Sequence, residues 1–247
     1  MIQLLKYEAM KKWRLFLIAI TVIFLAEGFI LFQLKVKNNL AFGIGLFLFI
    51  SYIGIFVIFI DSIQSYSREL KNKTGYSLFL VPRNAYEILG AKILIAFIEI
   101  ILAFILFIIA FGINYDIIAT AINSNMDFVY FIFTLIEDHI SFRVIFANTF
   151  ELLMSWFNFI IIAYLAITLS STLLSQNKFK GFISFILFIL INIVVHSFIL
   201  DNLFKIINAL TNLTSISMSI VSSFIIFIVS LLIYFLTAAL LEKHIDL

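Results

Sequence analysis

The chain has 247 residues, of which 64% are apolar and 12% are charged, and its formal net charge is +2. Soluble globular domains are roughly half apolar and a quarter charged, so this composition excludes a soluble domain and indicates an integral membrane protein. A net charge this small gives no reason to expect a nucleic-acid partner. Cysteine is absent, which excludes disulfides, thiolate zinc sites and iron–sulfur clusters.

Apolar stretches recur along the chain, and several reach the roughly 20 residues that a helix needs to cross a hydrocarbon core of about 30 Å. We therefore expect an all-α polytopic membrane protein with six transmembrane helices in a single transmembrane domain, residues 1–247. The expected spans cover residues 15–34, 40–60, 93–113, 152–169, 182–199 and 220–241.

The residues before the first span are not apolar enough to cross a membrane. Ile2, Leu5, Ala9 and Trp13 fall on one helical face, a pattern that predicts an interfacial helix with its tryptophan at the level of the headgroups. A positively charged lead-in without regular structure is the alternative.

On the side expected to be cytoplasmic, the longest polar stretch between two well-formed spans covers residues 64–92, which we call the 64–92 loop. Its five basic residues outnumber Glu69 and Glu87, its two acidic ones. Pro82, the one proline of the chain, ends any helix that precedes it. Asn84, followed three residues later by Glu87, predicts a helix start that leads directly into the third span.

Two helices are expected outside the membrane. Residues 127–141 place polar side chains at spacings of three and four with an apolar face beside them, which predicts an amphipathic outer helix between spans three and four. A transmembrane placement would put Glu137 and Asp138 near the middle of the bilayer, at high cost. Further along, Asp201 is expected to cap a short separate helix, residues 203–210.

The distribution of lysine and arginine predicts the orientation. With the N-terminus inside, the cytoplasmic segments hold twelve of these residues and the outer loops hold four. We therefore expect both termini in the cytoplasm and the chain in the plasma membrane, that is, the cytoplasmic (inner) membrane of a bacterium.

Sequence motifs for catalysis are absent. The chain contains no G-x-x-x-x-G-K-[ST] loop, no H-E-x-x-H and no G-x-S-x-G, and its three histidines lie far apart. We therefore expect no catalytic site, no metal and no cofactor in this chain. Energy for any transport must come from a partner subunit or from an ion gradient.

The 64–92 loop resembles the first cytoplasmic loop of ABC-2-type transporter permeases. The matching segments are Ser67-Arg68-Glu69-Leu70, Thr74-Gly75-Tyr76-Ser77-Leu78-Phe79-Leu80, Pro82-Arg83 and Glu87-Ile88-Leu89-Gly90-Ala91-Lys92. The chain departs from the family in having Lys73-Thr74-Gly75-Tyr76 where the family has a Gly-Thr order. In size, and in the lack of a large outer domain, it is similar to the small permeases that export phenol-soluble modulins or confer lantibiotic immunity.

The resemblance implies that residues 68–80 contain a coupling helix, which inserts into a groove of a separate ATPase subunit. It implies two such subunits carrying ATP and Mg²⁺, a second permease copy or a sister permease, surrounding lipid, and an exported amphipathic peptide or small hydrophobic compound. The residues expected to orient or anchor the ATPase are Arg68, Glu69, Lys71, Lys73, Tyr76, Phe79 and Leu80. A loop that only fixes topology and contacts anionic lipid is the alternative.

Four polar side chains are predicted deep within spans: Glu27, Asn158, Asn192 and His196. A lipid-facing carboxylate at such depth is disfavoured, so these groups are expected to face the interior and to line a translocation path. The alternative for Glu27 is that it is neutral, or that it bonds to an asparagine or serine of a neighbouring span as a structural contact. Asp61 and Glu99 lie nearer the inner boundary and are expected to be structural.

Two rival functions remain open. A gradient-driven secondary transporter would use buried charges in broken helices related by internal repeats, and the sequence contains no such repeat. A non-transporting membrane scaffold or immunity protein would bind a partner through the same loop without ATP-dependent efflux.

Overall fold

The structure is a computed structural model, and it describes residues 2–35, 40–71, 84–121, 142–173, 179–210 and 215–245. Within these ranges all regular structure is helical and there is no strand, which confirms the expected all-α class. Helices suit so apolar a chain because every backbone N–H and C=O inside a bilayer must be hydrogen-bonded within the protein.

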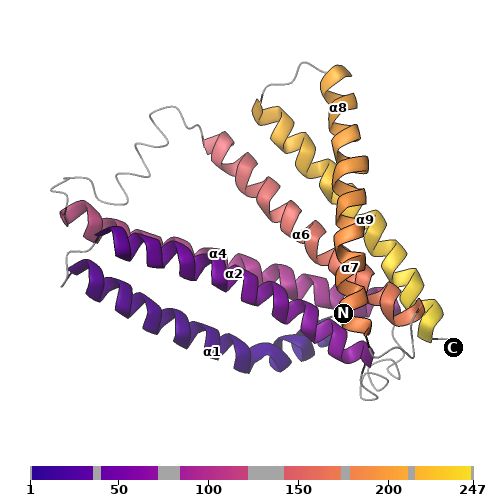
Figure 1. Cartoon of the computed structure of the whole chain (residues 1–247), viewed down its shortest axis with the longest axis horizontal. Coiled ribbons are helices and arrows are strands. Elements are labelled where there is room, and N and C mark those ends of the chain that lie inside the picture. The colour runs from indigo at the N-terminus through magenta and orange to yellow at the C-terminus, as the bar shows by residue number, and fades with distance from the viewer. Residues whose placement is uncertain are drawn as a thin grey trace. The chain divides into compact units, whose positions relative to one another are not determined.

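Figure 1 shows the described helices, coloured in the order in which they follow one another along the chain. Their bounds are α1 Ile2–Lys35, α2 Leu40–Lys71, α4 Ala85–Ala121, α6 Phe142–Leu173, α7 Lys180–Ile193, the π-helix η1 Val194–Leu200, α8 Asp201–Leu210 and α9 Ser215–Ile245.

Five helical stretches in the described part of the chain are long and apolar enough to cross a membrane. They are Phe42–Leu70, Ala85–Ala119, Phe146–Thr172, Gly181–Ile207 and Ser217–Lys243. The protein is therefore membrane-embedded. Within α1 the apolar stretch is Ile20–Gln33, which is shorter than the other five, so the sixth span stays a prediction.

The N-terminal residues and the first expected span form one element. α1, Ile2–Lys35, is one continuous helix without a break near Trp13. The interfacial position of its first turns stays a prediction.

The predicted helix start after Pro82 is confirmed. α4 begins at Ala85, and the backbone carbonyl of Asn84 accepts hydrogen bonds from the N–H groups of Glu87 at 3.0 Å and Ile88 at 3.3 Å. The helix then runs without interruption to Ala121.

The expected short helix at residues 203–210 is present as α8, but the prediction that Asp201 caps it is wrong. α7, η1 and α8 follow one another without a gap, and Asp201 has helical backbone angles of φ −60° and ψ −40°. Its N–H donates to the carbonyl of His196, five residues earlier, as a π-helix requires. Asp201 therefore continues a helix whose hydrogen-bonding pattern changes over seven residues.

Two predicted elements lie outside the described residues. These are the amphipathic outer helix, residues 127–141, and residues 72–80 of the coupling segment.

The helices are grouped in two compact units. The N-terminal unit contains Ile2–Ile60 and Leu94–Ser141, and the C-terminal unit contains Asp61–Ile93 and Phe142–Leu247. The end of α2 and the start of α4 therefore belong with the helices that follow them in the sequence.

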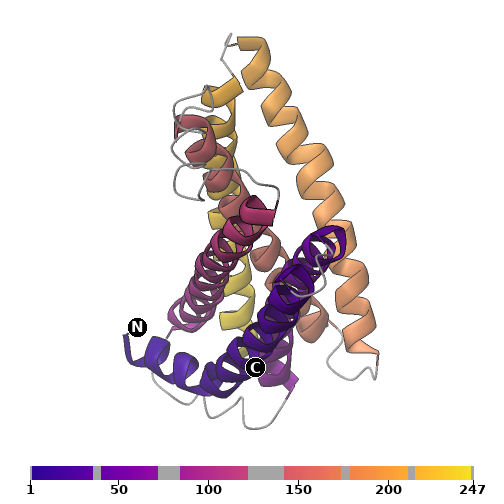
Figure 2. The same ribbon diagram turned by 90° about the vertical axis from the view of Figure 1, so that its left-hand side faces the viewer.

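Each unit has its own packing. In the N-terminal unit the rings of Phe47 on α2 and Phe111 on α4 lie 6.2 Å apart. In the C-terminal unit α6 lies against α9 and α7 (Figures 1 and 2). The apolar core of that unit is formed by Ile162, Val195, Leu200, Ile226 and Val229.

Candidate functional site

The structure describes only part of the residues predicted to dock an ATPase. Arg68 and Glu69 lie in the last turns of α2, and Lys71 is its final residue. Lys73, Tyr76, Phe79 and Leu80 lie outside the described residues. The structure describes the two ends of the 64–92 loop, which we call its stems. The first stem is residues 62–71 of α2, and the second is residues 84–92, which include the start of α4.

Arg68 is exposed at the end of α2, and its guanidinium donates a hydrogen bond of 2.8 Å to the side-chain oxygen of Gln64, one turn earlier. Since this partner is neutral and itself exposed, the charge of Arg68 stays available to an acidic partner surface.

Glu69 is held differently, because its carboxylate pairs with the ammonium group of Lys92 on α4. The two side chains are only 12% and 5% exposed. Because both side chains are little exposed, the pair links the two stems away from solvent. Glu69 thus joins α2 to α4 within the chain, and its predicted contact with an ATPase stays a prediction.

Tyr66 connects the first stem to α6. Its hydroxyl lies 2.7 Å from the hydroxyl of Thr168, and its ring stacks on that of Tyr164 with centroids 4.3 Å apart. The hydroxyl of Tyr164 in turn donates to the backbone carbonyl of Ser62 at 3.4 Å. Tyr66 is only 2% exposed, so these buried contacts fix the end of α2 on the central helix of the C-terminal unit.

Tyr234 connects the second stem to α9. Its hydroxyl donates a hydrogen bond of 2.6 Å to the backbone carbonyl of Tyr86, and the two rings meet edge to face at 6.5 Å. The ring of Tyr86 also contacts Phe235, at 6.2 Å. Both stems of the loop are therefore joined to helices that follow far later in the sequence.

Sequence reasoning missed these tyrosines. Tyr66 and Thr168 are separated by 102 residues, and Tyr234 and Tyr86 by 148. A tyrosine near the end of a span is ordinarily explained by the membrane interface, so nothing in the local pattern pointed to a buried partner.

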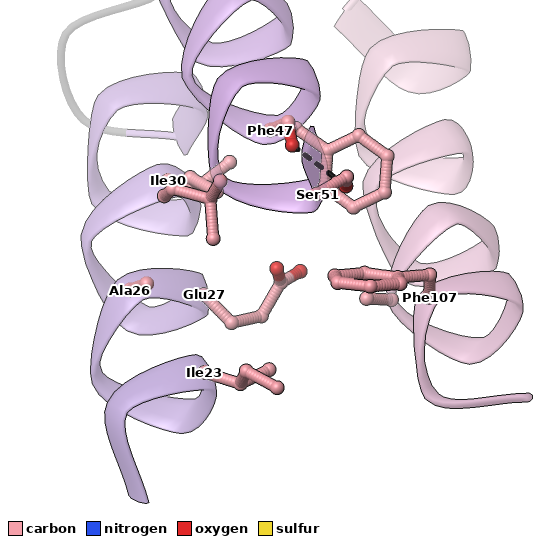
Figure 3. A pocket seen from close by; sticks show the side chains of 9 residues that line it. Ile23, Ala26, Glu27, Ile30, Phe47, Ser51 and Phe107 are labelled. Carbon is pink, nitrogen blue, oxygen red and sulfur yellow. Dashed lines mark hydrogen bonds between the residues drawn. The ribbon is translucent and has the colours of Figure 1, made fainter. Parts of the chain in front are cut away.

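Glu27 lies in the N-terminal unit beside a small cavity of about 10 Å³ (Figure 3), about the room that one water molecule needs. Its side chain extends from α1 toward Phe107 on α4, with Ser51 on α2 nearby (Figure 3). The carboxylate accepts a hydrogen bond of 2.8 Å from Nδ2 of Asn114 on α4. The other residues that line the cavity are apolar: Ile23, Ala26, Ile30, Phe47, Ile50 and Ala110.

A second polar pair joins the same two helices. The ammonium group of Lys12 on α1 lies 2.7 Å from the carboxylate of Glu99 on α4, with the two side chains 10% and 18% exposed. Glu99 was expected to be structural, and the pair gives it a partner within the N-terminal unit.

Asn158 lies between α6 and α9. It is fully buried, and its Nδ2 donates a hydrogen bond of 2.8 Å to the hydroxyl of Ser230. Two turns earlier on α6, Glu151 accepts a hydrogen bond of 2.9 Å from Ser222 of α9. These bonds are the interhelical contacts that polar side chains make inside membranes.

Asn192 and His196 both lie in the helical stretch Gly181–Ile207. Asn192 is on α7, and its buried Nδ2 has no hydrogen-bond partner among the residues that the structure describes. His196 is half-buried within η1. Asn158, Asn192 and His196 thus lie in the C-terminal unit and Glu27 in the N-terminal unit. The translocation path formed from all four stays a prediction.

In the described ranges no three histidine, cysteine, aspartate or glutamate side chains gather where they could hold a metal ion. A scan against protein-family models, a search of curated proteins and a search of solved structures each found no match. The roles of these residues therefore follow from the chemistry and geometry of this chain alone.

Proposed function

We propose that the chain is the permease subunit of an ATP-driven exporter of the ABC-2 type, with six spans and both termini in the bacterial cytoplasm. The observation that carries this proposal is the motif from Ser67 to Lys92 in the 64–92 loop. A separate ATPase subunit, which binds ATP and Mg²⁺, docks on that loop. The chain itself is not an enzyme.

The way the loop is held supports this function. A docking loop has to pass the movement of its partner to the membrane helices, so its ends must be fixed to them. The stems are joined to each other through Glu69 and Lys92, and to α6 and α9 through Tyr66 and Tyr234. A loop that only fixed topology would not need these buried contacts.

The complete exporter has two permease subunits and two ATPase subunits, and the second permease is an identical copy or a sister chain. When ATP closes the ATPase pair, the coupling segments move with it and the path opens outward. The exported molecule is an amphipathic peptide or a small hydrophobic compound, which suits a chain that contains 31 phenylalanines.

A gradient-driven carrier is the second candidate. The feature that favours it is Glu27, a carboxyl side chain inside an apolar stretch, bonded to Asn114 beside a cavity. Such a carrier works without an ATPase. Export that continues after ATP is removed, but stops when the membrane potential and pH gradient are collapsed, would favour it.

The deciding experiment is co-purification of the chain with an ABC ATPase encoded beside its gene. We expect a stable complex that Arg68→Glu and Phe79→Ala weaken. Lys205→Glu is the matched control, because Lys205 is exposed on α8 and the predicted topology assigns it to an outer segment; it should leave the complex intact. Failure to capture the ATPase with the unaltered chain would refute the proposal.

A captured complex is then tested for transport. We expect amphipathic peptides to stimulate its ATP hydrolysis in lipid vesicles and to be moved across the membrane when ATP is supplied. A complex that binds the ATPase but shows no ATP-dependent movement of any peptide would instead indicate a scaffold or immunity protein.

A further inference from the structure

Glu27 is far along α1 from Lys12. It lies fifteen residues beyond Lys12 on α1, which at 1.5 Å per residue is about 22 Å along the helix axis. It is half-buried, and it belongs to the apolar stretch Ile20–Gln33. Its carboxyl group therefore cannot reach the ammonium group of Lys12.

Among the residues that the structure describes around the cavity, none carries an opposite charge. These residues belong to α1, α2 and α4, and Glu27 is the only titratable side chain of the described lining. Lys12, the cation described at the other end of the same helix pair, already contacts Glu99 at 2.7 Å. An ionised carboxylate in apolar surroundings needs a countercharge or several hydrogen-bond donors. Glu27 has the one amide N–H of Asn114.

The side chain of Asn114 indicates which protonation state of Glu27 lies beside it. This side chain is 3% exposed, and its Oδ1 has no hydrogen-bond partner among the described residues. A buried amide oxygen needs a donor. An ionised carboxylate can only accept hydrogen bonds, whereas a protonated carboxyl group also donates one through its O–H. Protonated Glu27 and Asn114 can therefore pair twice, with N–H to C=O in one direction and O–H to C=O in the other.

We propose that Glu27 and Asn114 form a proton-binding site, in which the carboxyl group of Glu27 holds a proton at neutral pH and donates it to Oδ1 of Asn114. The cavity beside Ser51 has the volume to admit one water molecule, which brings and removes the proton. This site goes beyond ATPase docking and does not depend on it, because every residue that forms it lies in the N-terminal unit.

Glu99 provides an internal comparison. Glu99 lies on α4 and also joins α4 to α1, but its partner is the cation Lys12. A carboxylate paired with a cation keeps its charge. The same pair of helices thus holds one ionised carboxylate and, at the second contact, one protonated carboxyl group.

Infrared spectroscopy of the full chain in lipid nanodiscs at pH 7 tests the proposal. A protonated carboxyl group has a C=O stretching band that an ionised carboxylate lacks. We expect that band to be lost in Glu27→Gln and kept in Glu99→Gln. In Asn114→Leu it should move to higher frequency, because the C=O loses its hydrogen bond. Spectra in which the band is absent from the unaltered chain, or survives in a folded Glu27→Gln variant, overturn the proposal.

A chemical label identifies the ligand. The O–H of a protonated carboxyl group adds across a C=N bond of dicyclohexylcarbodiimide: the oxygen bonds to the central carbon and the proton passes to nitrogen. The resulting O-acylisourea rearranges to a stable N-acylurea, which mass spectrometry locates. We expect the adduct on Glu27 and not on Glu99, with labelling that falls as the pH is raised. Protection of Glu27 by sodium chloride but not by choline chloride at fixed pH would make Na⁺ the ligand and overturn the proposal.

Discussion

Lys12 on α1 and Glu99 on α4 form an ion pair of 2.7 Å, and the same two helices meet again where Asn114 bonds to Glu27. Both pairs are separated by 87 residues in the sequence. A constant separation means that α1 and α4 run parallel and in register over about 22 Å. The predicted topology has the first and third spans crossing in the same direction, which requires this parallel arrangement.

The first prediction concerns the ion pair of Glu69 and Lys92. Glu69→Gln should destabilise the protein by about 3 kcal/mol, because it removes the carboxylate that contacts the nearly buried ammonium group of Lys92. The exchange Glu69→Lys with Lys92→Glu keeps both charges and should recover most of the loss. Thermal unfolding in detergent measures both effects. If the exchanged variant is no more stable than Glu69→Gln, the pair does not link the stems.

The second prediction concerns the tyrosine of the first stem. Tyr66→Phe and Thr168→Val each remove one hydroxyl of a buried hydrogen bond, and each should lower the unfolding free energy by about 1–2 kcal/mol. The double variant should lose much less than the sum of the two, since neither hydroxyl is then left without its partner.

A functional assay distinguishes a role of the Tyr66–Thr168 contact in transport from a purely structural one. If Tyr66 passes movement from the loop to α6, the stable double variant should bind the ATPase normally and hydrolyse ATP without stimulation by peptide. Unchanged stimulation in that variant would restrict Tyr66 to a structural role.

The positions of the helices could be predicted from the sequence because apolar runs of sufficient length have few alternatives inside a bilayer. The start of α4 could be predicted as well, since Pro82 ends the preceding segment and Asn84 suits the position before a first helical turn. Both inferences depend on residues that are neighbours in the sequence.

The partners of polar residues could not be predicted in the same way. These helices are apolar all round, so periodicity does not indicate which face meets another helix. The apolar run around Glu27 predicts how deep this residue lies in its span, but it does not predict that Asn114 is its partner. The π-helix at Val194–Leu200 also escaped prediction, because a change from α to π hydrogen bonding leaves the apolar composition unchanged.

The third prediction uses two glycines of α2. A Cβ on Gly54 would lie 2.9 Å from Cζ of Phe107, whereas a Cβ on Gly45 would have no atom within 4 Å. Gly45→Ala should stabilise the helix by up to about 1 kcal/mol. Gly54→Ala should gain less, because the ring of Phe107 has to shift, and Gly54→Leu should destabilise by about 1–3 kcal/mol through overpacking. Equal melting temperatures for Gly54→Leu and Gly45→Leu would contradict this close approach of α2 and α4.

The fourth prediction separates the two roles considered for Asn158. Ser230→Ala leaves the fully buried amide of Asn158 without its hydrogen-bond acceptor, so it should destabilise the protein by about 1–3 kcal/mol. Asn158→Leu combined with Ser230→Ala removes both polar groups and should recover most of that stability, as measured by thermal unfolding. Leu153→Ala, a substitution of a half-buried residue on the same helix, is the control for a general loss of packing.

The same apolar double variant decides whether Asn158 belongs to the translocation path. A path residue supplies a polar group to the exported molecule, so an apolar replacement should abolish export even where the protein is as stable as the unaltered chain and still binds the ATPase. A purely structural residue can be replaced by a well-packed apolar pair without loss of transport. Full export by the stable double variant would therefore remove Asn158 from the path and leave it as a contact between α6 and α9.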